Sequence, residues 1–400
     1  MDSRRPRLQI SLVVFIDLLG FGILIPMLPF YVRHFGWGAF ELGLLMSIYS
    51  VCQIFAAPIW GKLSDRFGRR PVLLITILGQ GLSFLLAAFA WNYGLLFASR
   101  LLAGMFAGNI STASAYMADI TTRETRAKGM GLIGAAFGLG FTLGPAISAL
   151  VLPLGYAAPS LVAASLSFIN LIGAFLYLKE PHRTEAERER RRSRWTWKSF
   201  QDLLYRPVTI SIIFVFFLMT FAFVQLEVTI AMFVVDVFSF LESQAVLLLA
   251  GFGIVMAFVQ GLAVGPMVAR LGEPRLFLAG AIMMSLGLGG IVLSESVWQL
   301  LASLSVLAVG YSFSNPCLTS MLSKSVSDQE QGATLGIYHS GGSIARATAP
   351  ILAGLGYEAQ NRLPFLVATI LIISVCLIWS WRFNLLTRQN SYDVQVSKVR

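Results

Sequence analysis

Residues 61–71 read Gly-Lys-Leu-Ser-Asp-Arg-Phe-Gly-Arg-Arg-Pro and separate two long apolar runs. The stretch sets one acid, Asp65, among four cations: Lys62, Arg66, Arg69 and Arg70. A charged loop this short between two apolar runs predicts a tight helical hairpin. Because Lys and Arg concentrate on the cytoplasmic side of membrane proteins, these charges also predict the side of a membrane on which the hairpin closes.

The composition excludes an ordinary soluble protein. Of the 400 residues, 56% are hydrophobic and only 12% are charged, whereas soluble domains carry about 25% charged residues. Because a membrane-spanning helix needs about 20 apolar residues, the chain is predicted to be an all-α polytopic membrane protein with twelve spans. The expected spans are residues 8–32, 41–60, 72–91, 94–118, 127–151, 158–178, 207–234, 243–264, 275–294, 297–322, 332–355 and 363–386.

The placement of the positive charges predicts the topology. A formal net charge of +10 does not indicate nucleic acid here, because most Lys and Arg residues fall in alternate loops. Residues 62–70, 123–128 and 270–275 hold such clusters, whereas the opposite loops hold only Arg33 and Arg362. The positive-inside rule then places both termini in the cytoplasm, and we expect the protein in a bacterial inner membrane.

The two halves of the chain repeat each other. Gly61 to Gly68 is echoed 204 residues later by Gly265 to Gly272. Inverted or parallel repeats of this kind form two pseudo-symmetric six-helix bundles around a central cavity, which operate by alternating access. The expected organisation is an N-terminal bundle, a basic cytoplasmic linker, a C-terminal bundle and a cytoplasmic tail, at residues 1–178, 179–206, 207–386 and 387–400.

The linker at residues 179–206 is rich in arginine and contains Trp195 and Trp197. Basic residues with tryptophans are typical of an amphipathic helix on an anionic leaflet. A solvated linker that only obeys the charge topology is an equal alternative. The first interpretation makes anionic lipids a partner of this segment.

Four stretches together resemble the major facilitator superfamily. Residues 61–70 resemble its signature after the second span, Arg100 to Gly104 its fourth-span motif, and Gly140 to Pro145 the antiporter motif of its fifth span. Residues 17–29 resemble the first span of the tetracycline-efflux branch, although Ser83 replaces an acid of that branch. The resemblance implies a monomeric exporter that exchanges protons for a small amphipathic or drug-like substrate.

The same resemblance assigns roles to two motifs. It implies that Gly140, Gly144 and Pro145 press the fifth span against a span of the second half. It also implies that Asp119 lies near the charged hairpin, where Asp65, Arg69 and Asp119 form a latch on the cytoplasmic side. The gating motif then comprises Gly61, Asp65, Arg66, Gly68, Arg69, Arg70 and Asp119.

Asp17 is the foremost candidate for chemistry. It lies about 13 Å into the first span at 1.5 Å per residue, where an acid costs about 2.5–3.5 kcal/mol to insert. We expect proton coupling or substrate contact there, with Arg100 as its partner. Gly104, Gly108 and Thr112 follow Arg100 at intervals of four and are expected on the same helical face. The alternatives are an acid that permanently braces two helices and a fixed structural ion pair.

Polar residues inside other apolar spans are candidates for lining the cavity. Arg346 is expected to contact an anionic substrate or to pair with Glu227. His339 can titrate near neutral pH, although a lone histidine is more often a packing residue. The cavity candidates are Gln53, Asn109, Gln225, Glu227, Asn315, His339 and Arg346.

The sequence contains no phosphate-binding loop of the type that holds ATP and no cysteine or histidine spacing of a metal site. We therefore expect no cofactor, no bound metal and no enzyme activity, with a proton gradient as the driving force. Two alternatives to an exporter stay open. One is a metabolite or nutrient symporter or uniporter, and the other is a membrane sensor that does not transport.

Overall fold

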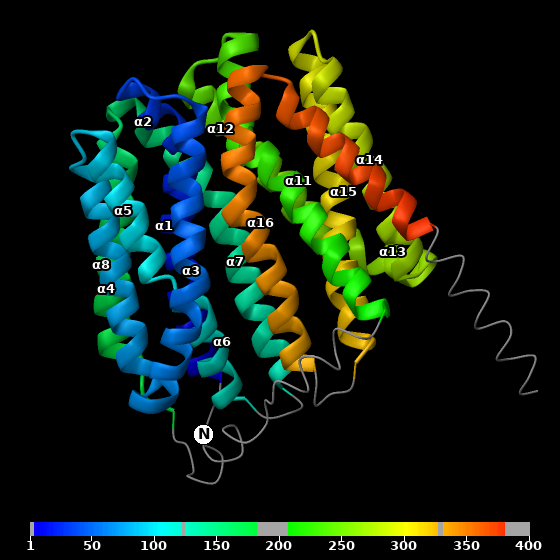
Figure 1. Cartoon of the computed structure of the whole chain (residues 1–400). Helices are drawn as coiled ribbons and strands as arrows, with labels where there is room; N and C mark the ends of the chain where they lie inside the picture. The colour runs from blue at the N-terminus through cyan, green and yellow to red at the C-terminus, as the bar shows by residue number, and fades with distance from the viewer. Residues whose placement is uncertain (1–3, 122–124, 182–206, 327–330, 381–400) are drawn as a thin grey trace, which may run out of the picture. The chain divides into compact units, whose positions relative to one another are not determined.

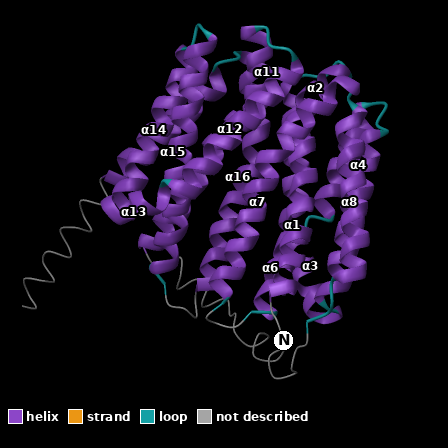
Figure 2. Ribbon diagram, turned by 180° about the vertical axis from the view of Figure 1, so that it is seen from behind, coloured by secondary structure: helices purple, strands orange, loops and turns teal. Residues whose placement is uncertain are grey.

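The computed structural model describes residues 4–121, 125–181, 207–326 and 331–380. These residues form helices joined by short turns, and no strand occurs among them (Figure 2). Eleven helical segments of the described chain are long and apolar enough to cross a membrane. The 29-residue helix α16 (Gln331–Ala359) corresponds to the remaining expected span. The predicted all-helical fold is confirmed.

The first compact unit comprises Met1–Asp202, Glu227–Ile254 and Arg346–Asn361. Within it α1 packs along α7 and α8, and α4 packs along α8 (Figure 1). The helices of its N-terminal part are α1 (Arg4–Leu24), η1 (Ile25–Met27), α2 (Leu28–His34), α3 (Ala39–Phe67), α4 (Arg69–Ala88), α5 (Tyr93–Met105), α6 (Asn109–Asp119), α7 (Arg126–Val151), η2 (Leu152–Leu154) and α8 (Ala157–Tyr177).

The second compact unit comprises Leu203–Leu226, Val255–Ala345 and Arg362–Arg400. Its most extensive internal packing is that of α14 along α15. Besides α16, the helices of the C-terminal part are α11 (Pro207–Phe238), α12 (Glu242–Leu262), α13 (Val264–Leu271), α14 (Glu273–Leu293), α15 (Val297–Lys324) and the unlabelled helix Leu363–Ser380. The amphipathic helix expected in the linker at 179–206 and the tail at 387–400 lie outside the described residues, except for residues 179–181.

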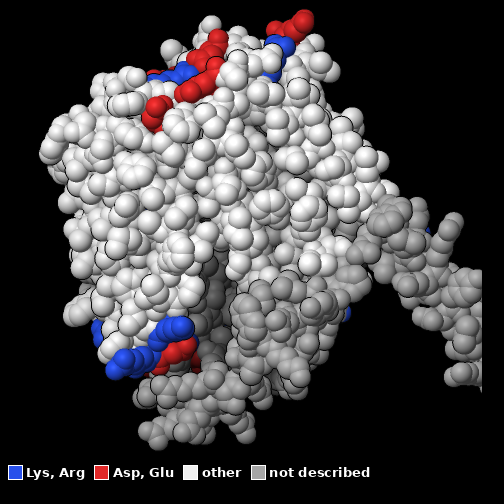
Figure 3. Space-filling model, in the orientation of Figure 1, with Lys and Arg blue, Asp and Glu red and all other residues white. Residues whose placement is uncertain are grey.

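Small and apolar side chains fill the core of the first unit. One buried cluster takes residues from α1, α4, α6, α7 and α8. On the face of this unit that Figure 3 shows, coloured charged side chains gather at the helix ends and the surface between them is uncharged. This distribution suits helices whose middle turns face lipid and whose ends face water.

The charged hairpin differs from its prediction in one respect. We expected residues 61–71 as a loop, but α3 continues to Phe67 and α4 begins at Arg69, so that Gly68 alone reverses the chain. Gly68 has φ +108° and ψ 158°, a region that only glycine enters readily. The loop assignment is therefore wrong, because Lys62 and Arg66 are good helix formers and one glycine suffices for the turn.

The same turn recurs in the second half of the chain. Gly272 follows α13 with φ +75° and ψ 156°, and α14 begins at the next residue. The echo of Gly68 at Gly272, predicted from the sequence, is thus confirmed in the backbone.

Candidate functional site

Asp17 lies on α1, and its Oδ1 atom accepts a hydrogen bond from the side-chain amide of Asn109 at 2.8 Å. Asn109 is buried, whereas Asp17 is partly exposed. The expected pairing of Asp17 with Arg100 is wrong, because the described residues show no ion pair between them, and Nε and Nη2 of Arg100 have no hydrogen-bond partner there. A neutral amide therefore takes the place that the sequence suggested for a cation.

A break in the fourth span positions Asn109. The helix ends at Met105 and resumes at Asn109. The indole nitrogen of Trp60 donates to the Met105 carbonyl at 2.7 Å, which satisfies an acceptor that a continuous helix would have used. A Cβ atom on Gly108 would lie 2.6 Å from Cβ of Trp60, so only glycine fits beside this indole. The expected continuous face from Arg100 onward is wrong because of this break.

Three more ionisable side chains of the first unit, Tyr49, Glu227 and Arg346, belong to the surroundings of Asp17 and Arg100. Tyr49 on α3 interacts electrostatically with Asp17, Arg100 and Arg346. Glu227 on α11 interacts electrostatically with Arg346 on α16, as the sequence suggested for this pair. Five helices, α1, α3, α5, α11 and α16, thus contribute ionisable side chains to one interacting group. We call these five residues, together with Asn109, the polar site.

The other cavity candidates are dispersed. Gln53 lies on α3 of the first unit and is partly exposed. In the second unit, Gln225 is buried, Asn315 is partly exposed and His339 is exposed. The His339 ring lies 5.5 Å from the ring of Tyr338, edge to face, which is an ordinary packing contact.

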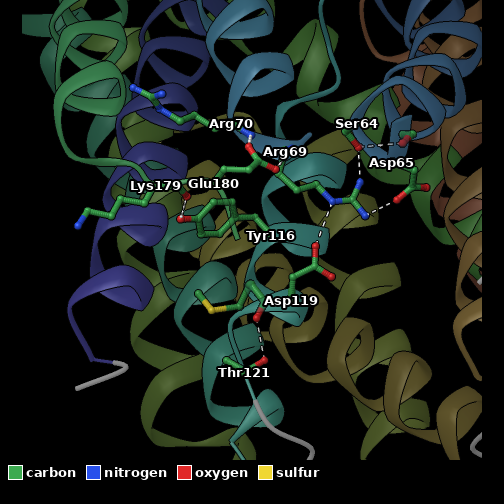
Figure 4. A network of polar contacts seen from close by, with 11 residues as sticks. Ser64, Asp65, Arg69, Arg70, Tyr116, Asp119, Thr121, Lys179 and Glu180 are labelled. Carbon is green, nitrogen blue, oxygen red and sulfur yellow. Dashed lines mark hydrogen bonds and ion pairs between the residues drawn. The ribbon is translucent and has the colours of Figure 1, made fainter. Parts of the chain in front are cut away.

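The charged stretch forms one polar cluster at the end of the α3–α4 hairpin (Figure 4). The buried Arg69 guanidinium donates to Asp65 Oδ1 at 2.5 Å and to Asp119 Oδ2 at 3.2 Å. It also donates to the Ser64 hydroxyl. The structure thus brings together the three residues expected to form a latch. Because these contacts join α3, α4 and α6, they fix the hairpin end against α6.

A carboxylate that the sequence did not single out completes this end of the unit. The two Glu180 oxygens accept hydrogen bonds from the backbone N–H groups of Arg69 and Arg70, at 2.6 and 2.7 Å. Beside it, the Tyr116 hydroxyl donates to the Lys179 carbonyl at 2.6 Å (Figure 4). These contacts attach the first residues after α8 to the start of α4 and to α6. A lone Glu after a span carries no sequence pattern that would have revealed them.

The remaining residues of the gating motif contact their immediate surroundings. Gly61 lies beside open space in the last turns of α3. Arg66 is exposed, with its guanidinium 5.2 Å from the centre of the Phe67 ring. Arg70 donates to the Phe175 carbonyl of α8 at 2.6 Å.

The antiporter motif packs mainly within the first half of the chain. A Cβ atom on Gly140 would lie 2.9 Å from Cβ of Leu18 on α1, and Gly144 meets the backbone of Gly22 even more closely. Pro145 lies inside α7. The implied partner in the second half is therefore wrong for the two glycines, which face α1. Between them, Thr142 does reach α12, where its hydroxyl lies 3.3 Å from the Gly253 carbonyl.

A second polar cluster joins the ends of α2, α11 and α16, and the sequence analysis missed it. Arg33 binds both carboxylate oxygens of Asp236, at 2.7 and 2.6 Å, and the Tyr357 hydroxyl donates to the same carboxylate at 2.6 Å. Nearby in the chain, Tyr156 donates to Glu242 at 3.0 Å. Burial and the Glu242 carboxylate raise the pKa of Tyr156 to about 12, so its hydroxyl remains a donor at neutral pH.

Comparison with known proteins covers nearly the whole chain. The model of the Major Facilitator Superfamily matches residues 10–261 and 229–398. The class C tetracycline resistance protein of Escherichia coli is 32% identical over 94% of this chain and 96% of its own length. Multidrug resistance protein 1 of Bacillus subtilis (strain 168) is 28% identical over 96% of this chain and 98% of its own length.

Solved structures agree in fold. The human organic anion transporter MFSD10 (TETRAN) is 25% identical, with a TM-score of 0.72 over 95% of this chain and all of its own. A bacterial homolog of the human lysosomal transporter Spinster, in an inward-facing and unoccupied conformation, has a TM-score of 0.81 at 12% identity, over 94% of this chain and 96% of its own. The protein is an integral membrane transporter and not an enzyme. The chain belongs to the Major Facilitator Superfamily.

Proposed function

We propose that the protein exports a small amphipathic, drug-like compound in exchange for protons, by alternating access between two bundles at residues 1–178 and 207–386. Relatives named for tetracycline and multidrug resistance support this direction of transport. The observation that carries the proposal is the partly exposed Asp17 carboxylate, held on one side by Asn109. An acid in the middle of a membrane helix that is neither sealed nor paired with a cation can both gain and lose a proton.

The Asn109 amide and the Asp17 carboxylate have different roles in this exchange. The Asn109 amide orients the carboxylate of Asp17 in both protonation states, because it donates to an oxygen that remains an acceptor. Substrate binds while Asp17 is ionised. A proton from the outer side then neutralises the carboxylate and releases the substrate, and loss of that proton to the inner side restores the site.

The topology belongs to the same proposal. Both termini and the hairpin at residues 61–71 face the cytoplasm of a bacterial cell, and the cluster around Arg69 stabilises the state that is closed on that side. The basic linker at 179–206 rests on anionic lipids, and the monomer is the working unit. Charge placement in the sequence supports the cytoplasmic side of the hairpin and the lipid contact of the linker.

The coupling is tested in proteoliposomes with an acidic lumen. Tetracycline and a fluorescent lipophilic cation serve as probes, and a pH-sensitive dye reports proton efflux. The wild type is expected to release protons when either probe is added, and Asp17→Asn is expected to abolish that release. The control Glu295→Gln removes an exposed acid in a turn of the second unit and is expected to behave as wild type. Undiminished proton release by Asp17→Asn would refute the coupling role.

A further inference from the structure

The starting observation is a cation on the side of the chain that carries few. The loops opposite the charged hairpin hold only Arg33 and Arg362, in keeping with the rarity of positive charge in outer loops. Arg362 donates to the Ser294 carbonyl of the second unit at 3.1 Å. Arg33 instead binds Asp236, a residue 203 positions farther along the chain. Its partner therefore comes from the other half of the sequence.

The Arg33–Asp236 pair has the geometry of a strong contact. Both ends of the guanidinium donate to the carboxylate, at 2.7 and 2.6 Å, and the Tyr357 hydroxyl donates to the same group at 2.6 Å. Bidentate, charge-assisted hydrogen bonds are stronger and more directional than neutral ones. These bonds join α2 of the first half of the sequence to α11 and α16 of the second half.

The start of α3 makes a second connection to α16. The backbone N–H of Phe40 donates to Glu358 Oε1 at 2.9 Å, where a helix N-terminus favours negative charge. Farther along the two helices, a Cβ atom on Gly43 would overlap the Pro350 carbonyl. Backbones this close leave no room for a side chain or a water molecule between α3 and α16.

A third contact of the same kind joins α8 to α12. Tyr156, just before α8, donates to Glu242, the first residue of α12, at 3.0 Å. All three contacts lie within the first unit. They also lie at the end opposite the charged hairpin, because α3 begins at Ala39 beside them and ends at Phe67 in the hairpin. At this end the two halves of the sequence are thus fastened together.

We propose that Arg33, Asp236 and Tyr357 form an outer latch, which must separate before the protein opens to the outside. This inference rests on the alternating access between two bundles proposed above. The close contact of α3 with α16 blocks the path, and the latch holds that contact in place. The Arg33 and Asp236 side chains are 31% and 34% exposed. Water can therefore solvate both charges when they part, whereas a fully buried pair would be far costlier to break.

The test measures how often a buried position behind the latch becomes accessible from outside. Ser47 is 3% exposed and follows Gly43 by four residues, on the same face of α3. In spheroplasts that express the full-length protein, Ser47→Cys is treated with a membrane-impermeant maleimide, and the protein with its three native cysteines gives the background. Slow labelling is expected at Ser47→Cys. Rapid labelling is expected at Trp37→Cys, since Trp37 is 46% exposed just before α3.

Four variants in the Ser47→Cys protein assign the latch. Arg33→Gln and Asp236→Asn are each expected to raise the labelling rate at least about tenfold, because a bidentate pair with a third donor exceeds an ordinary surface pair. Tyr357→Phe removes one hydroxyl only, so an increase of about threefold is expected. Arg362→Gln is the matched control, since it removes the other outer cation and is expected to leave the rate unchanged. Thermal unfolding of each purified variant shows that it is folded.

The double variant Arg33→Gln/Asp236→Asn is expected to label no faster than the faster single variant, because the two residues act through one contact. Four outcomes overturn the inference: Trp37→Cys that does not label from outside, Arg33→Gln that labels at the original rate, Arg362→Gln that labels as fast as Arg33→Gln, or increases that multiply in the double variant.

Labelling needs neither a substrate nor a proton gradient, so failure of the proposed function is a separate result. If the variants label as expected but Asp17→Asn still releases protons, the latch stands and the coupling role is wrong. If proton release behaves as proposed but labelling does not change, the exchange stands and the latch is wrong.

Discussion

Arg69 allows a direct test of what stabilises the charged cluster. Its guanidinium bonds to Asp65 at 2.5 Å and to Asp119 at 3.2 Å. Distance alone ranks the Asp65 contact as the stronger one. Burial gives the opposite ranking, because the Asp65 side chain is 55% exposed and that of Asp119 only 9%.

The magnitudes follow from this difference. An exposed ion pair contributes about 0.2–1 kcal/mol, whereas a buried hydrogen bond to a charged group contributes about 1.5–3 kcal/mol. Arg69→Ala removes both contacts and leaves Asp119 buried without this cation, so a loss of about 3–5 kcal/mol is expected. In double-mutant cycles we expect a coupling of about 2 kcal/mol for Arg69 with Asp119 and below about 1 kcal/mol for Arg69 with Asp65.

The assay is equilibrium unfolding of the purified protein in detergent, with Asp65→Ala and Asp119→Ala as the second members of the two cycles. Arg66→Ala is the matched control, because Arg66 is an exposed arginine of the same motif, and it is expected to change the free energy of unfolding by less than about 0.5 kcal/mol. If the coupling with Asp65 exceeds that with Asp119, the argument from burial is refuted.

Two further predictions concern turns and breaks in the helices. Gly68→Ala is expected to lower the free energy of unfolding more than Gly272→Ala. Both substitutions place a side chain in a backbone conformation with positive φ, which costs about 1–3 kcal/mol. A Cβ atom at Gly68 would also lie 2.9 Å from the Glu180 carboxylate, whereas a Cβ atom at Gly272 would have its nearest neighbour at 3.9 Å. Equal losses on unfolding would show that Glu180 moves aside freely. Trp60→Phe keeps an aromatic ring but removes the donor to the Met105 carbonyl, so a loss of about 1 kcal/mol is expected; unchanged stability would mean that packing alone holds the break.

The membrane spans could be predicted because each depends on the total hydrophobicity of a stretch of residues and not on any single one. About 20 apolar residues in succession specify a membrane helix almost regardless of their order, and the positive residues between them predict which helix ends face the cytoplasm. The exact ends could not be predicted. Helix α3 continues to Phe67 because the charged residues in its last turns tolerate helical geometry well. Only the backbone of Gly68 decides where the chain reverses.

The candidate site was predictable in its members and less so in its pairs. Asp17 and Arg100 stand out because any charge in an apolar span does. Asp17 bonds instead to Asn109, which follows a helix break where Trp60 of another helix donates to the Met105 carbonyl. Contacts of this kind depend on tertiary packing between distant segments, and a single sequence carries no local pattern for them.

The repeat explains why Glu180 is needed at one hairpin of the chain. A helix N-terminus favours negative charge by about 0.3–1 kcal/mol, and α14 meets this preference itself, since its first residue Glu273 also bonds to Lys324 at 2.7 Å. The equivalent helix α4 begins with Arg69 and Arg70, which carry the unfavourable sign. Glu180 supplies the missing carboxylate by accepting from both of their backbone N–H groups. The two hairpins share the same backbone turn, but α14 begins with an acid and α4 begins with two arginines. Glu180, which follows α8, therefore places at the N-terminus of α4 the negative charge that Glu273 places at the N-terminus of α14.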